Sequence, residues 1–101
     1  MKSDLYRERL QRDPENPLFC FSLGQALFEE EAYEEAAGYL LKCAQSRADW
    51  MMPRILAGKA LVYLNKSAEA KSILQEALEL AIEQQHDDPA AEMRELLREM
   101  A

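Results

Sequence analysis

The sequence predicts an all-α protein, a stack of about six helices arranged as antiparallel pairs. The first observation is a repeat, because Leu23–Leu27 (LGQAL) recurs in outline as Ala57–Leu61 (AGKAL), 34 residues later. A period of 34 residues is typical of helix–turn–helix units that stack into a solenoid. The second is composition: the 101 residues include three glycines and four prolines, and the Ala, Leu, Glu, Lys and Gln that dominate favour helix.

Capping and breaking residues divide the first half of the chain into three helices. We expect an N-terminal helix over residues 3–12, ended by the segment Asp13–Pro17. Asn16 suits the cap of a second helix and Pro17 its first turn. This second helix runs to about residue 30, where an acidic turn ends it, and a third helix covers residues 33–45.

The second half repeats this organisation. Pro53 must lie in the first turn of the fourth helix, because proline inside a helix costs about 3 kcal/mol. That helix ends near residues 64–66, where Asn65 suits a left-handed turn, and a fifth helix covers residues 67–85. Asp88 is the expected cap of the last helix, residues 88–100, with Pro89 at its first position.

The repeated positions resemble the tetratricopeptide repeat (TPR) family. The matching residues are Leu23, Gly24, Leu27, Ala36, Leu40 and Cys43 in residues 17–50, and Ala57, Gly58, Leu61, Ala70, Leu74 and Ala77 in residues 51–84. The resemblance implies one domain over residues 1–101, a right-handed stack of antiparallel helix pairs. Residues 3–12 then correspond to the end of an incomplete repeat, residues 17–50 and 51–84 to two repeats, and residues 88–100 to a capping helix.

Small residues in the two repeats indicate where paired helices approach closely. Glycine inside a helix costs up to about 1 kcal/mol relative to alanine, so close packing is the expected compensation. We expect Gly24 to face Ala36 and Gly58 to face Ala70. The sequence departs from the family pattern at Cys20 and Arg54, where TPR units carry a large aromatic residue.

The resemblance also implies a binding surface, because the first helix of each TPR pair lines the concave face. The matching positions are Leu18, Phe21, Gln25 and Phe28 in the first repeat, and Met52, Ile55, Lys59, Val62 and Tyr63 in the second. Most are apolar, which is typical of an interaction surface. Three interpretations remain open: a groove for a peptide or amphipathic helix, a surface for self-association, or a core covered by the N-terminal helix.

These observations predict a protein–protein interaction scaffold and not an enzyme. The alternatives are a homo-oligomerisation module, possible as a homodimer, and a small chaperone for secreted or assembling proteins, which the repeat type and acidic pI suggest by resemblance to bacterial secretion chaperones. Only Lys59 is basic among the concave positions, so we do not expect the carboxylate clamp that some family members use. Trp50, between the repeats, is expected to act as a packing wedge.

Charge and motif content exclude several other classes of function. The net charge of −7 repels phosphate backbones and anionic lipid, and no apolar run approaches the roughly 20 residues that span a bilayer, so neither nucleic acid nor membrane insertion is expected. His86 is the only histidine, and no catalytic group, metal site or cofactor is expected. Cys20 and Cys43 are expected to be buried thiols of a cytoplasmic protein.

Overall fold

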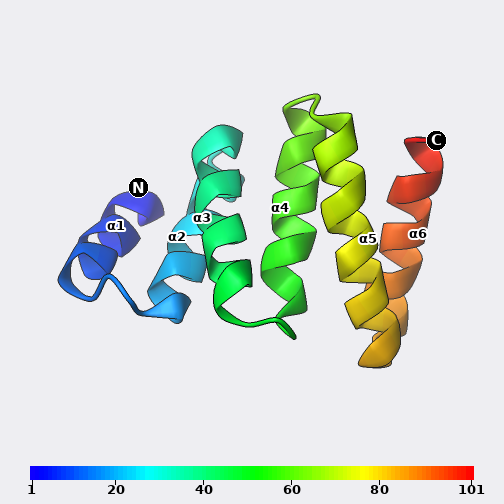
Figure 1. Ribbon diagram of the computed structural model, residues 1–101. Coiled ribbons are helices and arrows are strands. Elements are labelled where there is room, and N and C mark those ends of the chain that lie inside the picture. Colours follow the sequence, from blue (N-terminus) through cyan, green and yellow to red (C-terminus); the bar gives the residue numbers. More distant parts are fainter.

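The computed structural model describes all 101 residues and contains six α-helices and no strand. The helices are α1 (Lys2–Arg12), α2 (Pro17–Glu29), α3 (Tyr33–Ser46), α4 (Met51–Tyr63), α5 (Ser67–Glu83) and α6 (Asp87–Glu99). Each helix packs against the next one along the chain, and the two termini lie at opposite ends of the row (Figure 1). The molecule measures 40 × 27 × 19 Å. The predicted all-α stack of helix pairs is confirmed.

Two of the predicted helix starts follow from single residues. The side-chain oxygen of Asn16 accepts hydrogen bonds from the backbone N–H groups of Leu18 and Phe19, at 2.9 and 3.2 Å. These two donors belong to the first turn of α2 and have no partner within the helix. Pro53 is the third residue of α4, where its missing N–H costs nothing. Both residues therefore do what the sequence predicts.

Three helix ends share one backbone turn. The φ angles of Glu31, Asn65 and Gln85 are 63°, 60° and 59°. After each of them the chain makes the same hydrogen bond, from Ala32 N–H to Leu27 O (2.9 Å), Lys66 to Leu61 (2.9 Å) and His86 to Ala81 (2.8 Å). This is the Schellman motif, which closes a helix with a left-handed residue. The sequence predicts the turn only at Asn65, because the other two residues are not typical of it.

The start of α6 corrects one prediction. The turn at Gln85 places His86 at the N-cap, and the helix begins at Asp87. Asp88 and Pro89 therefore lie in the first turn, and they are not the cap and the first helical residue. The helix begins earlier than predicted because the left-handed residue Gln85 redirects the chain directly after α5. Asp88 is therefore already inside the helix.

The two glycines in mid-helix lie at close crossings, but their nearest partners differ from the prediction. A Cβ atom on Gly24 would lie 2.8 Å from Cδ2 and Cγ of Leu40. On Gly58 it would lie 2.5 Å from Cδ2 and 2.7 Å from Cγ of Leu74. The two leucines are fully buried, one helical turn beyond the expected alanines. A leucine side chain, and not an alanine methyl, fills the space that each glycine leaves.

Arg54, at a position where the resemblance predicts a large aromatic residue, makes polar contacts at the joint between the repeats. Its guanidinium donates hydrogen bonds to the carbonyl oxygens of Ala44 (3.1 Å), Arg47 (3.3 Å) and Trp50 (2.6 Å). These carbonyls lie at the end of α3 and in the connection to α4. A planar guanidinium can serve several carbonyls at once, so Arg54 fixes the first turn of α4 against the end of α3.

The N-terminal helix is attached to the turn between α2 and α3. The Glu30 carboxylate accepts hydrogen bonds from the backbone N–H of Ser3 at 3.1 Å and from its hydroxyl at 2.6 Å. Ser3 is buried, and a carboxylate at a helix N-terminus is favoured by the helix dipole. An ion pair between Arg7 and Glu35, 3.0 Å long, adds a second link.

Candidate protein-binding surface

Helices α2, α4 and α6 share one side of the molecule, here called the α2–α4–α6 face. Helix α2 contacts α4 directly. Helix α4 is linked to α6 by an ion pair between Lys59 and Glu92, with a distance of 2.9 Å between nitrogen and oxygen. All the predicted binding residues lie on α2 and α4. Their exposure decides which of them a partner can touch.

Most of the predicted binding residues are accessible. Leu18 and Tyr63 are 62% exposed and Met52 is 42% exposed. The others that a partner can reach are the exposed Gln25 and the half-buried Phe21, Phe28, Lys59 and Val62. These side chains come from α2 and α4, two helices that contact each other.

Ile55 corrects the prediction. It is only 3% exposed and belongs to a core cluster that also contains Leu74 of α5 and Met93 of α6. Side chains of α5 and α6 therefore enclose the isoleucine. The interpretation as core therefore holds for Ile55, and a partner cannot contact it in this conformation.

A hollow lies between α4 and α6. Its volume is about 270 Å³, and it is lined by Met52, Leu56 and Lys59 of α4 and by Asp88, Pro89 and Glu92 of α6, with Ile55 at its base. Lys59 and Glu92 neutralise each other, and their ion pair crosses the hollow. The hollow therefore combines apolar side chains with one ion pair and with Asp88, which takes part in no ion pair.

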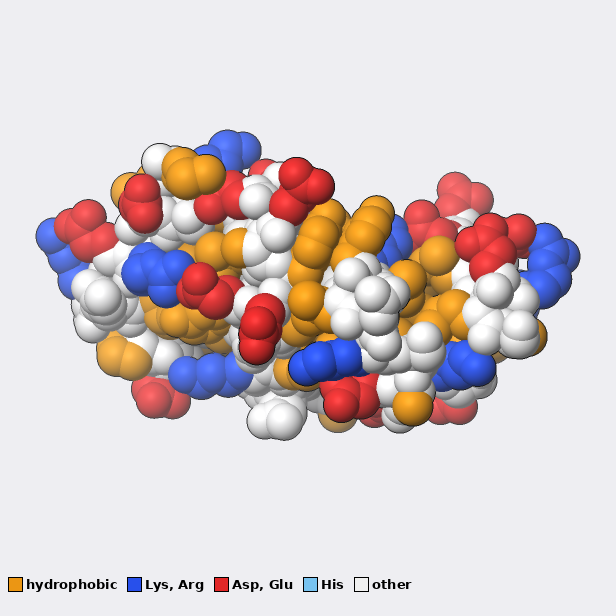
Figure 2. All heavy atoms as spheres, turned by 90° about the horizontal axis from the view of Figure 1, so that it is seen from above, with side chains coloured by type: hydrophobic (Ala, Val, Ile, Leu, Met, Phe, Trp, Pro, Cys, Tyr) orange, Lys and Arg blue, Asp and Glu red, His pale blue; other side chains and the backbone are white.

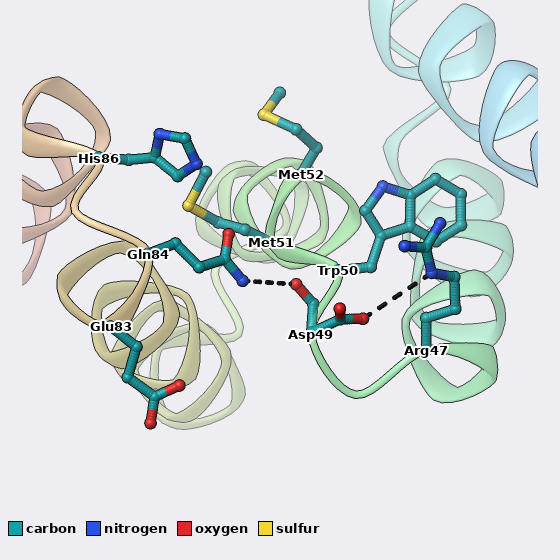
Figure 3. Close-up of a pocket in the computed structure, with 8 residues that line it drawn as sticks. All are labelled: Arg47, Asp49, Trp50, Met51, Met52, Glu83, Gln84 and His86. Atoms are coloured by element: carbon teal, nitrogen blue, oxygen red, sulfur yellow. Dashed lines mark hydrogen bonds and ion pairs between the residues drawn. The ribbon is translucent and has the colours of Figure 1, made fainter.

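A larger hollow lies at the N-terminal ends of α4 and α6. It measures about 580 Å³, and its lining includes Trp50, Met51, Met52 and His86. Figure 3 shows Gln84 and His86 on one side, Trp50 with Arg47 on the other, and the two methionines between them. The Trp50 ring is half-buried against Phe21, with ring centroids 5.2 Å apart, and the Arg47 guanidinium lies 5.4 Å from its centre.

Three aromatic side chains meet where α2 and α4 end and α3 begins. The rings of Tyr33 and Tyr63 are stacked, with centroids 4.5 Å apart and planes at 11°. Phe28 lies edge-on to both, at 5.4 and 6.3 Å. Phe28 and Tyr63 are predicted binding residues, whereas Tyr33 was not predicted. Tyr33 lies at the start of α3, which the left-handed turn at Glu31 folds back against α2.

The two cysteines are buried thiols, as predicted. Cys20 and Cys43 are 4% and 2% exposed, and both donate to the carbonyl oxygen of Tyr39, at 3.3 and 3.1 Å. Burial, with a contribution from the neighbouring Cys20, raises the pKa of Cys43 to about 12. A thiol with this pKa stays protonated near neutral pH and is a poor nucleophile.

Apart from the two cysteines, the side chains that could bind a metal ion do not cluster. Nowhere do three or more His, Cys, Asp or Glu side chains lie where they could hold a metal ion. No helix combines the length and the apolar content that crossing a membrane requires.

Comparisons with known proteins show which fold this is. No protein-family model matches the sequence, and no curated protein matches it either. The chain is similar to the Yersinia enterocolitica type III secretion translocator chaperone SycD, with a TM-score of 0.90 and 18% identity over 97% of this chain and 68% of that one. PcrH, solved in complex with the chaperone-binding region of PopD, gives 0.89 and 19% over 97% and 74%.

A third similar structure is the TPR2B domain of yeast Sti1 in its pHsp70 complex. Its TM-score is 0.84, with 20% identity over 97% of this chain and 78% of that chain. At these identities the likeness establishes the fold, which is the TPR helical-repeat fold that the residues of the two repeats indicate.

Proposed function

We propose that this chain is a protein–protein interaction scaffold that holds a peptide or an amphipathic helix of a partner on its α2–α4–α6 face, without catalysing a reaction. The observation that carries the proposal is the distribution of exposed large apolar side chains. Of six in the chain, Leu18, Met52 and Tyr63 belong to α2 and α4. Of the other three, Met1 precedes α1, Leu5 lies in α1 and Ile82 lies in α5, so α2 and α4 carry half of the exposed large apolar side chains.

The chemistry of the face supports an apolar ligand. Lys59 is already paired with Glu92, so it is not free to bind a carboxylate. Phe21, Phe28 and Val62 are half-buried between the exposed residues and extend the apolar surface along two helices. Apolar anchors in a shallow groove are typical of helix recognition. The buried, reduced cysteines fit a reducing compartment such as the cytoplasm.

A chaperone for secreted or assembling proteins is the second candidate. It is favoured by the similarity to SycD and PcrH, because the latter was solved with a segment of the protein that it binds. In both cases an apolar segment of the client would occupy the face. The two candidates differ in outcome: a chaperone keeps its client soluble, whereas a scaffold holds a partner that is soluble alone.

The test is a pull-down from native lysate with two matched double variants. In Leu18→Ser/Met52→Ser two of the three exposed large apolar side chains of the face are removed. In Leu5→Ser/Ile82→Ser the same number of exposed apolar side chains, 46% and 52% accessible, is removed from α1 and α5. We expect a protein captured by the wild type and by the second variant, and not by the first.

Light scattering on the same samples addresses self-association. A wild-type dimer that becomes monomeric only in Leu18→Ser/Met52→Ser would replace the scaffold by a homo-oligomerisation surface. Equal capture by all three proteins would overturn the assignment of the face.

A further inference from the structure

Two thiol groups meet between α2 and α3. The Sγ atoms of Cys20 in α2 and Cys43 in α3 both donate hydrogen bonds to the carbonyl oxygen of Tyr39, at 3.3 and 3.1 Å. Cys43 and Tyr39 lie one turn apart on the same helix, so only the bond from Cys20 crosses between helices. It brings the Cys20 sulfur to the turn of α3 that carries Cys43. Neither cysteine forms a disulfide in this structure.

A small hollow opens beside the two cysteines. Its volume is about 80 Å³, and Cys20, Cys43, Lys42, Ser46 and residues 14–17 line it. Figure 2 looks onto the end of the stack where α2 and α4 end, and hydrophobic side chains lie there among charged ones. The hollow is at the opposite end, where the connection from α1 to α2 runs beside the end of α3 (Figure 1). A water molecule takes up about 30 Å³, so the hollow admits hydrogen peroxide but not oxidised glutathione.

We propose that Cys20 and Cys43 form a redox-sensitive pair, which hydrogen peroxide oxidises to a disulfide that joins α2 to α3. The proposal depends on two features of the structure. The shared acceptor brings the two sulfur atoms to the same place between the helices, and the hollow beside them has room for the oxidant.

The reaction has two steps. In the first, the thiolate of one cysteine attacks an oxygen of hydrogen peroxide and the O–O bond breaks; the sulfur becomes a sulfenic acid, and the departing hydroxide takes up the thiol proton to give water. In the second, the thiolate of the other cysteine attacks the sulfenic sulfur. The S–S bond forms, the S–O bond breaks, and the hydroxide leaves as a second water. Each sulfur gives up one electron, and one peroxide is reduced to two waters.

The surroundings of Cys43 make this pair slow to react. Burial, with a contribution from the neighbouring Cys20, raises the pKa of Cys43 to about 12. The thiolate is the reactive form, so oxidation is slow near neutral pH and becomes faster as the pH rises. The pair therefore responds to sustained peroxide and not to a brief exposure, which separates it from a catalytic peroxidase cysteine.

The disulfide would act on a helix that also carries predicted binding residues. Cys20 is followed by Phe21, whose ring packs against Trp50 with centroids 5.2 Å apart. An S–S bond of about 2.05 Å is much shorter than a contact between unbonded sulfur atoms, so its formation must draw Cys20 toward α3 and shift Phe21. The inference does not rest on the proposed function, because the disulfide forms whether or not the α2–α4–α6 face binds a partner.

The experiment exposes the reduced full-length protein to hydrogen peroxide and then counts the remaining thiols. Iodoacetamide in denaturant labels every free thiol, and peptide mass spectrometry identifies the labelled or cross-linked cysteines. We expect both labels to disappear together, faster at pH 9 than at pH 7, and to return after dithiothreitol. The urea midpoint of the oxidised protein should rise by roughly 1 M, because the cross-link constrains the unfolded chain.

A shifted pair of thiols provides the matched control. Cys43→Ala/Ala44→Cys keeps two buried thiols but turns one of them by about 100° around α3, away from the shared acceptor. This variant should form no disulfide within the chain, and its urea midpoint should not rise with peroxide. The single variant Cys43→Ala should behave in the same way. Circular dichroism checks that each variant is folded before oxidation.

Several results would overturn the inference. These are two thiols that still take up iodoacetamide after prolonged peroxide, sulfinic acid at either cysteine in place of the cross-link, or equal cross-linking in the shifted pair. The Leu18→Ser/Met52→Ser variant retains both cysteines and should form the same disulfide, so failure of the pull-down and failure of the oxidation are independent results. Fluorescence of Trp50, the only tryptophan, should change on oxidation and recover with dithiothreitol; unchanged emission would contradict the shift of Phe21.

Discussion

The sharpest test of the packing concerns Gly58. In Gly58→Ala the new methyl group would lie 2.5 Å from Cδ2 and 2.7 Å from Cγ of Leu74. Favourable carbon–carbon contacts are about 3.5–4.0 Å long, so Leu74 or the helices must move by about 1 Å. Leu74 is fully buried and has little space to do so. Overpacking of this kind costs about 1–3 kcal/mol, against a gain of about 1 kcal/mol in helix propensity.

Gly38 provides the matched control. It also lies inside a helix, α3, but a Cβ atom there would meet nothing within 4 Å. Gly38→Ala should therefore stabilise the protein by about 1 kcal/mol, through propensity alone. We expect the free energy of unfolding to be about 1–3 kcal/mol lower for Gly58→Ala than for Gly38→Ala.

The assay is urea unfolding followed by far-ultraviolet circular dichroism. The same substitution is also made in the Leu74→Ala variant, which itself costs about 2–5 kcal/mol. In this variant the side chain that obstructs the new methyl group is absent. Gly58→Ala should then stabilise, like Gly38→Ala. If Gly58→Ala stabilises the wild type as much as Gly38→Ala does, or if the Leu74→Ala background changes nothing, the close crossing does not explain this glycine.

Three further predictions concern the joint, the N-terminal helix and the thiols. Arg54→Leu should lower the free energy of unfolding by about 1–2 kcal/mol, because charge-assisted hydrogen bonds to three carbonyls are lost. The control Arg94→Leu, at an exposed position without an ion pair, should lower it little. Equal losses of the two variants in urea unfolding would contradict the role of Arg54. Glu30→Gln should weaken the attachment of α1 by about 1 kcal/mol, seen as faster amide exchange in residues 2–12, whereas Glu34→Gln should not. The pKa of Cys43 is raised in the folded protein, from 9.0 to about 12, so the folded state holds the proton more tightly than the unfolded chain. Its contribution to stability is complete below about pH 9 and is lost as the pH rises from 9 to 12, so urea midpoints of the wild type should fall over this interval more steeply than those of Cys43→Ala.

Much of the fold was predictable because it is encoded locally or at a fixed period. The 34-residue repeat identifies the helix pairs, Asn16 and Pro53 mark two helix starts, and Asn65 marks one turn. The equivalent turns at Glu31 and Gln85 were not predictable, because glutamate and glutamine do not favour a positive φ. There the hydrogen bonds of the Schellman motif and the packing of the next helix impose the conformation.

The candidate surface was predictable only in part. The repeat register places Leu18, Met52 and Tyr63 on one side of their helices, and the structure leaves them exposed there. The register does not show which residues the neighbouring helices cover, and Ile55 is buried among side chains of α5 and α6. It also says nothing of contacts between helices of different type, such as the stacking of Tyr33 on Tyr63.

The sequence by itself therefore determined the helices, their pairing and the side of each helix that faces outward, because these follow from periodicity and from single capping or breaking residues. Only the tertiary structure decided which outward residues stay exposed, which leucines occupy the space over Gly24 and Gly58, and where Arg54 and Glu30 find their partners. The physical reason is that burial and hydrogen bonding at these positions depend on atoms that are distant in the sequence, and a period records only the residue's place on its own helix.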